Sequence, residues 1–245
     1  MDEAIVRKMK AEAERGVKAV QAGRLDVAGQ HFNNALNHAE DLDNDRTRRD
    51  EISVLSMLFD ESGFPDLALM AAEESVELDR RLGLDTLLHG DIINVGTAHL
   101  NLNNDVKAEA CFREALDFAL KRGEWANAAS ANTNLGNVFA KRGEMKSAIG
   151  VYEKSLEYLA KESFDNTEMN TRLMLLQASE IDNYDVEHAI DNARKLCERF
   201  WKDMQGMHRQ AATKFITQAV ERYLKSHPQK NPKAWKAKTF PVIFA

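Results

Sequence analysis

The chain has 245 residues, of which 44% are hydrophobic and 29% charged, and this is enough to bury a sizeable core. It contains 12 Gly and 4 Pro, and no Pro lies between Pro65 and Pro228. This composition argues against an all-β sandwich and a loop-rich disulfide scaffold, which need frequent turn residues, and favours an all-helical protein. The net charge of −6 gives no support for nucleic-acid binding.

The sequence shows no sign of a targeting or membrane segment. The N-terminal stretch is charged throughout and lacks the apolar core of a signal peptide. The longest uncharged run, residues 125–140, contains four Asn, one Ser and one Thr, so no segment is expected to span a bilayer. Cys111 and Cys197 are far apart and predict neither a disulfide framework nor a zinc site. We therefore expect a cytoplasmic protein without membrane association.

The first two thirds of the sequence repeat with a period of 40 residues. A turn residue recurs at Gly23, Gly63, Asn103 and Gly143. An alanine follows each turn at Ala28, Ala68, Ala108 and Ala148, and a small residue precedes each at Gly16, Ser56, Gly96 and Gly136. A further column holds Phe32, Ala72, Phe112 and Tyr152. Columns that keep one register over four repeats predict a repeat architecture.

The columns predict that each repeat is a helix hairpin. Their spacings of three, four and seven place the small and large residues on one helical face. A small residue such as Gly136 lets a neighbouring helix approach closely, and an aromatic residue such as Tyr152 fills the gap beside it. A glycine between the two helices adopts left-handed backbone at little cost, and Asn103 tolerates the same conformation.

Residues 134–159 carry the pattern most clearly. Its Leu-Gly pair, aromatic, Gly turn, Ala, aromatic and small residue are Leu135, Gly136, Phe139, Gly143, Ala148, Tyr152 and Ser155. This resembles a tetratricopeptide repeat, of the longer 40-residue type found in kinesin light chains and in cell-polarity adaptors with GoLoco motifs. The resemblance implies an all-α fold, a right-handed α-α superhelix whose concave groove is lined by the first helix of each hairpin and holds a peptide or a partner helix.

We predict a solenoid over residues 1–203, a capping helix at 207–226 and a basic, extended tail at 227–245. About five hairpins are expected, at residues 1–42, 46–82, 85–122, 125–162 and 167–203. In the fifth, Ala189 lies 41 residues after Ala148, so the register slips by one, and Tyr184 replaces the turn glycine. Its first helix is expected over residues 169–182. An end with one polar face, as the capping helix provides, is what stacked repeats need.

Two interpretations of the tail stay open. Residues 225–245 carry five Lys and no acid, so the first 224 residues carry a net charge of −11. The apolar residues at its end are Phe240, Val242, Ile243 and Phe244. The tail could dock in a repeat groove of its own chain or of a neighbouring copy, which would give self-association. Alternatively, its apolar residues complete the C-terminal core beside Phe215 and Tyr223.

No arrangement of residues predicts catalysis. The sequence lacks GxGxxG, a Walker-type phosphate loop, GxSxG and HExxH. The seven His are scattered, and no nucleophile, base and orienting group are brought together by spacing. We therefore predict a chain that is not an enzyme, with no cofactor and no metal site.

The resemblance implies groove-facing residues on the first helix of each hairpin. In the second to fourth hairpins these are Asp50, Met57, Asp60, Glu61, Asn94, Thr97, Asn101, Asn134, Asn137 and Lys141. In the first hairpin they are Lys10, Ala13, Val17 and Gln21. Asn94 and Asn134 lie 40 residues apart, and their amides either form a ladder that bonds a partner's backbone or bond locally.

These features predict a protein-protein interaction scaffold or adaptor whose partner is a protein or peptide. The carboxylates of the second hairpin, Asp50, Asp60 and Glu61, suit a basic partner segment, and a solvated acidic face is the other interpretation. An alternative function is a peptide-sensing regulatory domain whose repeats change superhelical pitch when a ligand binds. No nucleic-acid or membrane partner is expected.

Overall fold

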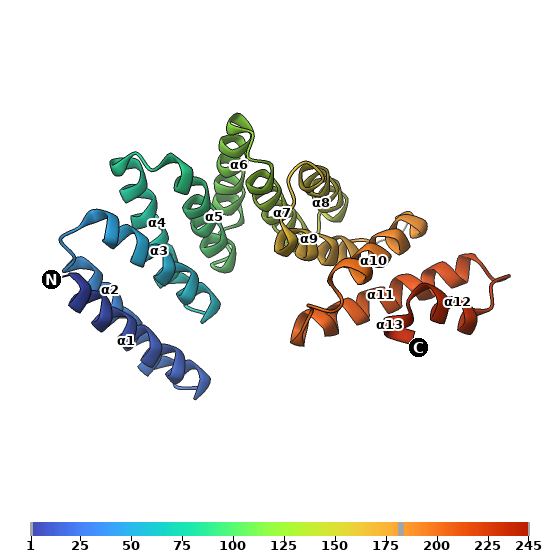
Figure 1. Cartoon of the computed structure of the whole chain (residues 1–245), viewed down its shortest axis with the longest axis horizontal. Helices are drawn as coiled ribbons and strands as arrows, with labels where there is room; N and C mark the ends of the chain where they lie inside the picture. Colours follow the sequence, from blue (N-terminus) through green and yellow to red (C-terminus); the bar gives the residue numbers. More distant parts are fainter. Residues whose placement is uncertain (1, 181–183, 245) are drawn as a thin grey trace. The chain divides into compact units, whose positions relative to one another are not determined.

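The computed structural model describes residues 2–180 and 184–244 and divides the chain into two compact units. The N-terminal unit ends at Gly123 and the C-terminal unit begins at Glu124. All described secondary structure is helical (Figure 1), so the predicted all-α solenoid fold is confirmed. Each unit is described separately below.

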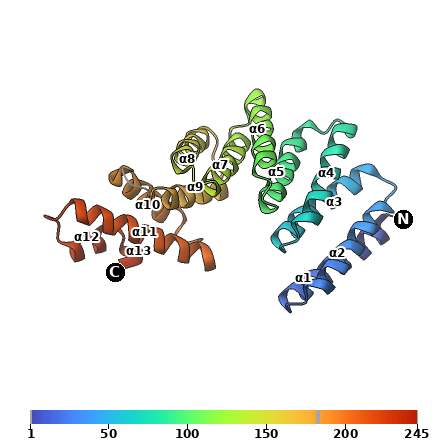
Figure 2. The ribbon, with the colours of Figure 1, turned by 180° about the vertical axis from the view of Figure 1, so that it is seen from behind.

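The N-terminal unit contains three helix hairpins. Its helices are α1 (Asp2–Gln21), α2 (Leu25–Glu40), α3 (Asp45–Glu61), α4 (Pro65–Leu82), α5 (Asp85–Asn101) and α6 (Asp105–Arg122). Each odd-numbered helix packs along the even-numbered helix that follows it, and both Figure 1 and the reverse view in Figure 2 show these pairs side by side. Helix α3 begins after Asn44, whose side chain accepts a hydrogen bond of 2.9 Å from the backbone N–H of Thr47.

The C-terminal unit is also built from helices. They are α7 (Trp125–Lys141), α8 (Met145–Leu159), α9 (Asp165–Ala178), α10 (Val186–Phe200), α11 (Gly206–Ser226), α12 (Pro232–Thr239) and α13 (Pro241–Phe244). Helix α8 packs against both α7 and α9, and α11 packs against α9 and α10. Helix α11 therefore lies at the position predicted for the capping helix.

The turns inside the hairpins have the predicted backbone. Gly23, Gly63 and Gly143 have φ values of 70°, 80° and 78°, and Asn103, although not a glycine, has a φ of 60°. The left-handed region is open to glycine and tolerated by asparagine, so this column is occupied for its backbone conformation. The sequence analysis missed Gly83 and Gly123, which have φ values of 67° and 71° and end the second helices α4 and α6.

The small-residue column is a set of close helix contacts. A Cβ atom added to Gly96 would lie 2.6 Å from Cε1 of Phe112, and one added to Gly136 would lie 2.7 Å from Cδ1 of Tyr152. Gly16 faces the ring of Phe32 in the same way. In these three hairpins an aromatic ring of the second helix thus rests directly on the backbone of the first, as the column spacing predicts.

We expect Gly136→Ala to destabilise the protein by about 1–3 kcal/mol, because its methyl group would overlap the buried ring of Tyr152. Gly150 is the matched control, since it is also helical but a Cβ atom there meets nothing within 4 Å. Gly150→Ala should stabilise by about 0.5–1 kcal/mol through helix propensity. Urea unfolding of both variants checks the pair. Equal effects of the two substitutions would contradict the assigned contact.

The fifth hairpin is built from α9 and α10. Its first helix runs from Asp165 to Ala178, so it begins four residues before the predicted start, and Ser179 and Glu180 form a turn instead of continuing the helix. The last two residues of the predicted helix, 181 and 182, lie outside the described residues. Helix α10 begins after Asp185, whose carboxylate accepts hydrogen bonds from the backbone of Glu187 and His188. Ala178 and Ala189 are both buried, but Ala178 packs in the cluster that contains Tyr152 of α8, whereas Ala189 belongs to the C-terminal core.

The prediction of an extended tail is wrong, because residues 232–244 form α12 and α13. The prolines were interpreted as helix breakers, but Pro232 and Pro241 each stand at the first position of a helix, where proline is tolerated. Asn231 caps α12 by accepting a hydrogen bond of 3.1 Å from the backbone of Ala234. The ring of Trp235 then stacks on α11.

The tail completes the core of its own chain. Phe240 is fully buried in a cluster that also contains Phe215 and Tyr223, and the ring centroid of Trp235 lies 4.5 Å from that of Tyr223. Of the two interpretations left open by the sequence, the structure thus favours core packing. Lys233 and Lys238 are exposed, as is Val242 at 50%, whereas Lys230 and Lys236 are partly buried and lie over the rings of Tyr223 and Phe244.

Phe240→Ala is expected to lower the free energy of unfolding by about 3–5 kcal/mol, because it opens a cavity in the C-terminal core. Val242→Ala, two residues away, should change it by less than about 0.5 kcal/mol, because that side chain is half-exposed. Thermal and urea unfolding measure both. If Phe240→Ala instead altered only the oligomeric state, the tail would be a self-association segment rather than part of the core.

Candidate functional site

Helix α3 is flanked by two hollows in the surface of the N-terminal unit. The first lies between α1 and α3 and has a volume of about 390 Å³. It is lined by Met9, Lys10, Ala13, Glu14, Val17, Lys18, Gln21, Glu51, Val54, Leu55 and Leu58. We call this the α1–α3 hollow. All four residues that were predicted to face the groove on the first helix, Lys10, Ala13, Val17 and Gln21, line it.

The α1–α3 hollow combines an apolar wall with a charged rim. Val54 is 54% exposed, which leaves a β-branched side chain open to solvent beside the half-buried Leu58. At the rim, Lys10 Nζ donates a hydrogen bond of 2.9 Å to Glu51 Oε1 and joins the two helices. An apolar wall with convergent polar groups at its edge is the usual character of a ligand-binding cleft.

The second hollow lies between α3 and α5 and has a volume of about 130 Å³. It is lined by Ser56, Met57, Asp60, Glu61, Asn94 and Thr97, and all except Ser56 were predicted groove residues. We call this the α3–α5 hollow. Asn101, also predicted, lies beside it and donates a hydrogen bond of 2.6 Å from Nδ2 to Asp60 Oδ1. The structure therefore brings six predicted residues together around one small, polar hollow.

Three predicted residues lie in the C-terminal unit. Asn137 and Lys141 line a hollow of about 260 Å³ between α7 and α9, where Tyr152 donates a hydrogen bond of 2.7 Å to Asn137 Oδ1. Asn134 Oδ1 accepts a longer hydrogen bond of 3.5 Å from Asn137 Nδ2. Asn94 and Asn134 belong to different units, so an amide ladder through both stays a prediction.

Asp50 is not brought to either hollow of the N-terminal unit. Its carboxylate accepts hydrogen bonds of 3.3 Å from Arg46 Nε and 3.3 Å from Arg49 Nη1 near the start of α3. The acidic groove residues of the second hairpin are thus Asp60 and Glu61, whereas Asp50 belongs to a separate group of charges.

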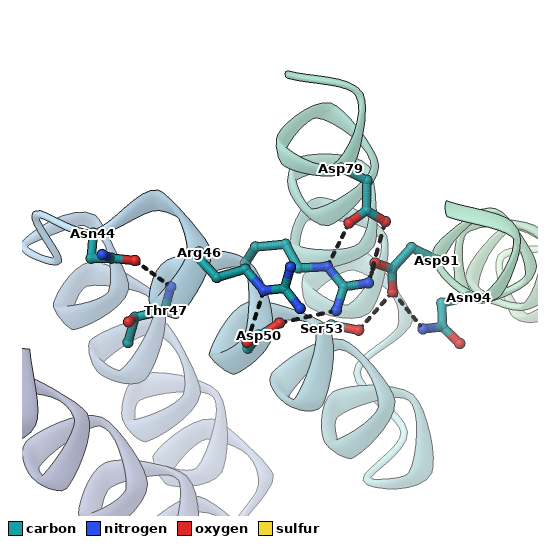
Figure 3. Close-up of polar contacts among 9 residues, drawn as sticks. Asn44, Arg46, Thr47, Asp50, Ser53, Asp79, Asp91 and Asn94 are labelled. Carbon is teal, nitrogen blue, oxygen red and sulfur yellow. Dashed lines mark hydrogen bonds and ion pairs between the residues drawn. The ribbon is translucent and has the colours of Figure 1, made fainter. Parts of the chain in front are cut away.

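That group centres on a buried arginine that the sequence analysis missed. Arg49 Nε donates a hydrogen bond of 2.6 Å to Asp79 Oδ1, and its Nη2 donates to both Asp79 and Asp91. Ser53 Oγ donates a hydrogen bond of 2.6 Å to Asp91 Oδ1. Figure 3 shows the two carboxylates of α4 and α5 converging on the side chains of α3. One buried cation therefore ties three helices together.

This cluster, Arg49 with Asp79 and Asp91, carries an excess of negative charge. Asp79 is fully buried and Asp91 is 2% exposed, and a single guanidinium faces both carboxylates. Burial raises the pKa of Asp91 to about 6, and Asp79 adds to the increase while Ser53 and Arg49 oppose it. The cluster thus holds one carboxyl group that gains a proton under mildly acidic conditions.

The repeat columns do contain a signal for this cluster. The column of Arg49 is Met9, Arg49, His89 and Ala129, that of Asp79 is Ala39, Asp79, Ala119 and Leu159, and that of Asp91 is Ala11, Glu51, Asp91 and Ala131. Opposite charges thus stand in columns whose other members, apart from His89 and Glu51, are apolar and in many cases buried. Comparing charge along each column would have predicted a buried ion pair.

Asn94 connects the cluster to the α3–α5 hollow. It lines that hollow, and its Nδ2 donates a hydrogen bond of 3.3 Å to Asp91 Oδ1. This bond favours the interpretation that Asn94 is held locally, with its amide oxygen left for another donor. The charge on Asp91 therefore affects the strength of the hydrogen bond that holds Asn94 in the wall of the α3–α5 hollow.

We predict that Asp91→Asn removes a pH dependence of stability. The carboxyl has a pKa of about 6 in the folded chain and an ordinary pKa of 3.8 in the unfolded chain, so the folded state binds more protons between these two values. Its contribution to stability should therefore increase as the pH falls through 6 and be smallest near pH 7.5. The variant retains an acceptor for Ser53 and Arg49, and it should be at least as stable as the wild type near pH 7.5.

The measurement is the free energy of urea unfolding from about pH 5 to pH 7.5 for both proteins. The wild type should gain roughly 1 kcal/mol relative to the variant on going to the lower pH, because pH 5 lies only about one unit below the pKa of Asp91. A constant difference between the two proteins across this range would show that Asp91 keeps an ordinary pKa.

The described residues suggest neither a metal site nor a membrane span. Within residues 2–180 and 184–244, no group of three or more His, Cys, Asp and Glu could hold a metal ion. No helix in the same residues is long and apolar enough to cross a bilayer.

One family model matches the sequence. The family described as soluble NSF attachment protein, SNAP, matches residues 96–199, which is less than half of the chain. No curated protein matches the sequence.

Solved structures match over most of the chain at low identity. Aspartyl phosphate phosphatase F from Bacillus subtilis is 11% identical with a TM-score of 0.70, over 96% of this chain and 65% of that one. A Rap protein complexed with competence and sporulation factor is 13% identical with a TM-score of 0.62, over 95% and 68%. A putative kinesin light chain with TPR-like repeats from Podosopora anserina is 13% identical with a TM-score of 0.57, over 81% and 97%.

These likenesses concern the fold alone. The chain spans 65% of the length of the phosphatase, which is less than two thirds, so that protein's activity does not carry over. The match to kinesin light chain repeats agrees with the 40-residue period and with the positive-φ turn column of the hairpins. The chain therefore has the fold of the tetratricopeptide-repeat proteins, as its repeat columns predicted.

Proposed function

We propose that this chain is a protein-interaction module that binds a peptide or a partner helix along α1, α3 and α5. The observation that carries the proposal is the α1–α3 hollow, an apolar depression of about 390 Å³ that no side chain of the described residues fills. Its wall exposes Val54, and exposed apolar surface framed by charges is typical of a site that another protein covers.

The two hollows contribute differently to the proposed recognition of a partner. The α1–α3 hollow is large enough for one or two apolar side chains, which would supply most of the affinity by leaving water. The α3–α5 hollow is smaller and offers Met57, the amide of Asn94 and the carboxylate of Glu61, which would set register and orientation. Because Asp60 already accepts a hydrogen bond from Asn101, Glu61 is the carboxylate that we assign to a basic side chain of the partner.

The comparisons support this proposal at the level of fold. The Rap protein was solved in complex with competence and sporulation factor, so a similar helical fold binds another molecule there. A peptide-sensing regulatory domain, the alternative function, is favoured by the same likeness.

The free cysteines Cys111 and Cys197 support the cytoplasmic location that is part of the proposal. The non-enzymatic role is likewise inferred from the site, whose groups suit binding.

The alternative makes a separate prediction that scattering can examine. A sensing domain changes its dimensions when the ligand binds, whereas a scaffold keeps them. Small-angle X-ray scattering with and without a saturating peptide therefore separates the two functions. An unchanged radius of gyration would count against the sensing alternative and leave the scaffold proposal in place.

The binding proposal is tested with peptides selected from a random displayed library on the wild-type protein. We expect Val54→Asp to weaken the selected peptides by about tenfold or more, because it places a carboxylate against an apolar anchor. Since Val54 is half-exposed, the substitution should leave folding intact. Isothermal titration calorimetry measures the affinities, and circular dichroism confirms the helical content.

Val106→Asp serves as the matched control, because Val106 is 79% exposed on α6 and lines neither hollow. It should bind the selected peptides as the wild type does. The proposal fails if the library yields no binder, or if the selected peptides bind the Val54→Asp and Val106→Asp proteins equally well.

A further inference from the structure

A third hollow in the N-terminal unit is formed by a different set of helices. It has a volume of about 400 Å³ and lies where α4 and α6 both pack along α5. It is lined by Glu73, Val76, Glu77, Arg80, Ile92, Val95, Cys111 and Glu114. We call it the α4–α6 hollow. It shares no residue with the α1–α3 or α3–α5 hollow, and two of its three helices are the second helices of their hairpins.

The floor of this hollow is apolar. Val76 and Ile92 are buried, and Val95 is half-buried beside them. In the repeat register Val76 stands where the other hairpins have Leu36, Leu116 and Leu156. Because valine is smaller than leucine, Val76 fills less space than the leucine of the other three hairpins. This difference helps to leave a depression that another apolar side chain can enter.

The rim of the hollow is acidic. Glu73 and Glu77 lie one turn apart on α4 and are both exposed, and among the described residues neither forms a hydrogen bond or ion pair. On the opposite rim Glu114 accepts a hydrogen bond of 3.2 Å from Arg80. Glu114 is thus partly neutralised, whereas the Glu73 and Glu77 end keeps two uncompensated negative charges.

Cys111 forms part of the wall, but its chemistry is passive. Burial, followed by the charges of Glu114 and Glu73, raises the pKa of this thiol. It therefore stays protonated and is a poor nucleophile. Cys111 is useful as a probe of occupancy, because a ligand that fills the hollow covers its thiol.

We propose that the α4–α6 hollow is a second docking surface, which takes an amphipathic segment of a partner protein with a Lys or Arg next to an apolar side chain. The apolar side chain covers Val76, Ile92 and Val95, and the cation lies between Glu73 and Glu77. At the other end Arg80 and Glu114 form an ion pair, so a cation of the partner is attracted to the Glu73 and Glu77 end and the segment binds in one direction. Charge complementarity with an apolar floor selects this chemistry over an acidic or purely apolar partner.

The chain's own basic segment fits this role less well. Its Lys residues lie on the same stretch as Trp235 and Phe240, and these rings are committed to the C-terminal core. Their transfer to another copy would expose that core. A separate partner is therefore the occupant that we assign, and self-association is a distinct outcome of the test.

The probe is a synthetic helix-forming peptide with leucines along one face and lysines flanking them, and its counterpart carries glutamates in place of the lysines. Two readouts are needed, the fluorescence anisotropy of the labelled peptide and the rate at which a maleimide modifies Cys111. Cys197 is the internal reference, because it is also free and partly buried but lies in the other unit. The lysine peptide should bind and slow the modification of Cys111 but not of Cys197, and the glutamate peptide should do neither.

The decisive variant is Glu73→Gln with Glu77→Gln, compared with Glu144→Gln with Glu221→Gln, which removes the same charge from exposed positions of the other unit. The first pair should weaken the lysine peptide by about three- to thirtyfold and abolish protection of Cys111, and the second should change neither. Val54→Asp should leave the protection of Cys111 unchanged, because Val54 lines the α1–α3 hollow, so this readout is independent of the proposed function.

Three results would overturn the proposal. The lysine peptide could fail to bind, or bind both double variants equally, or bind without protecting Cys111. Concentration-dependent self-association of the wild type that is lost in Glu73→Gln with Glu77→Gln would assign the hollow to a second copy of the chain instead.

Discussion

In three of the hairpins, an aromatic ring that lies on a glycine sets the spacing between the two helices. Gly16, Gly96 and Gly136 each face an aromatic ring that occupies the space of a Cβ atom. The backbone of the first helix is thereby held at the distance of one ring from the second helix. On α1, Gly16 is buried against Phe32 while the neighbouring Val17 lines the α1–α3 hollow. The same contact thus fixes which face of the helix remains available to a partner.

The fold could be predicted from the sequence because each structural position occurs once in every repeat, so several residues support each assignment. Asn103 alone says little, but in a column with three glycines it predicts a left-handed turn, and its φ is 60°. Past residue 160 no such column is available, and the tail was assigned from composition. The prolines in the tail predicted an extended chain, but Pro232 and Pro241 each begin a helix. Phe240, which lies between these helices, packs in the C-terminal core. A single proline does not distinguish the start of a helix from its interruption.

The site was predictable only in part. Mapping the repeat onto α3 and α5 identified Met57, Asp60 and Asn94, because helical periodicity alone decides which side chains share a face. Asp50 was assigned to the same face, but Arg46 and Arg49 hold its carboxylate at the start of the helix. The ion pairs that Arg49 forms with its two buried carboxylates join residues 30 and 42 positions apart, and periodicity within one helix carries no information about them.

Helix α3 is a wall of both the α1–α3 and the α3–α5 hollow, and this has a consequence for how partners are distinguished. A segment that fills one hollow loses its translational and rotational freedom once, and filling the second adds contacts without repeating that loss. The chain of the partner between its two anchors must then span the width of one helix. The number of partner residues between the two anchoring side chains, more than the identity of either side chain, would therefore decide whether a partner occupies both hollows or only one.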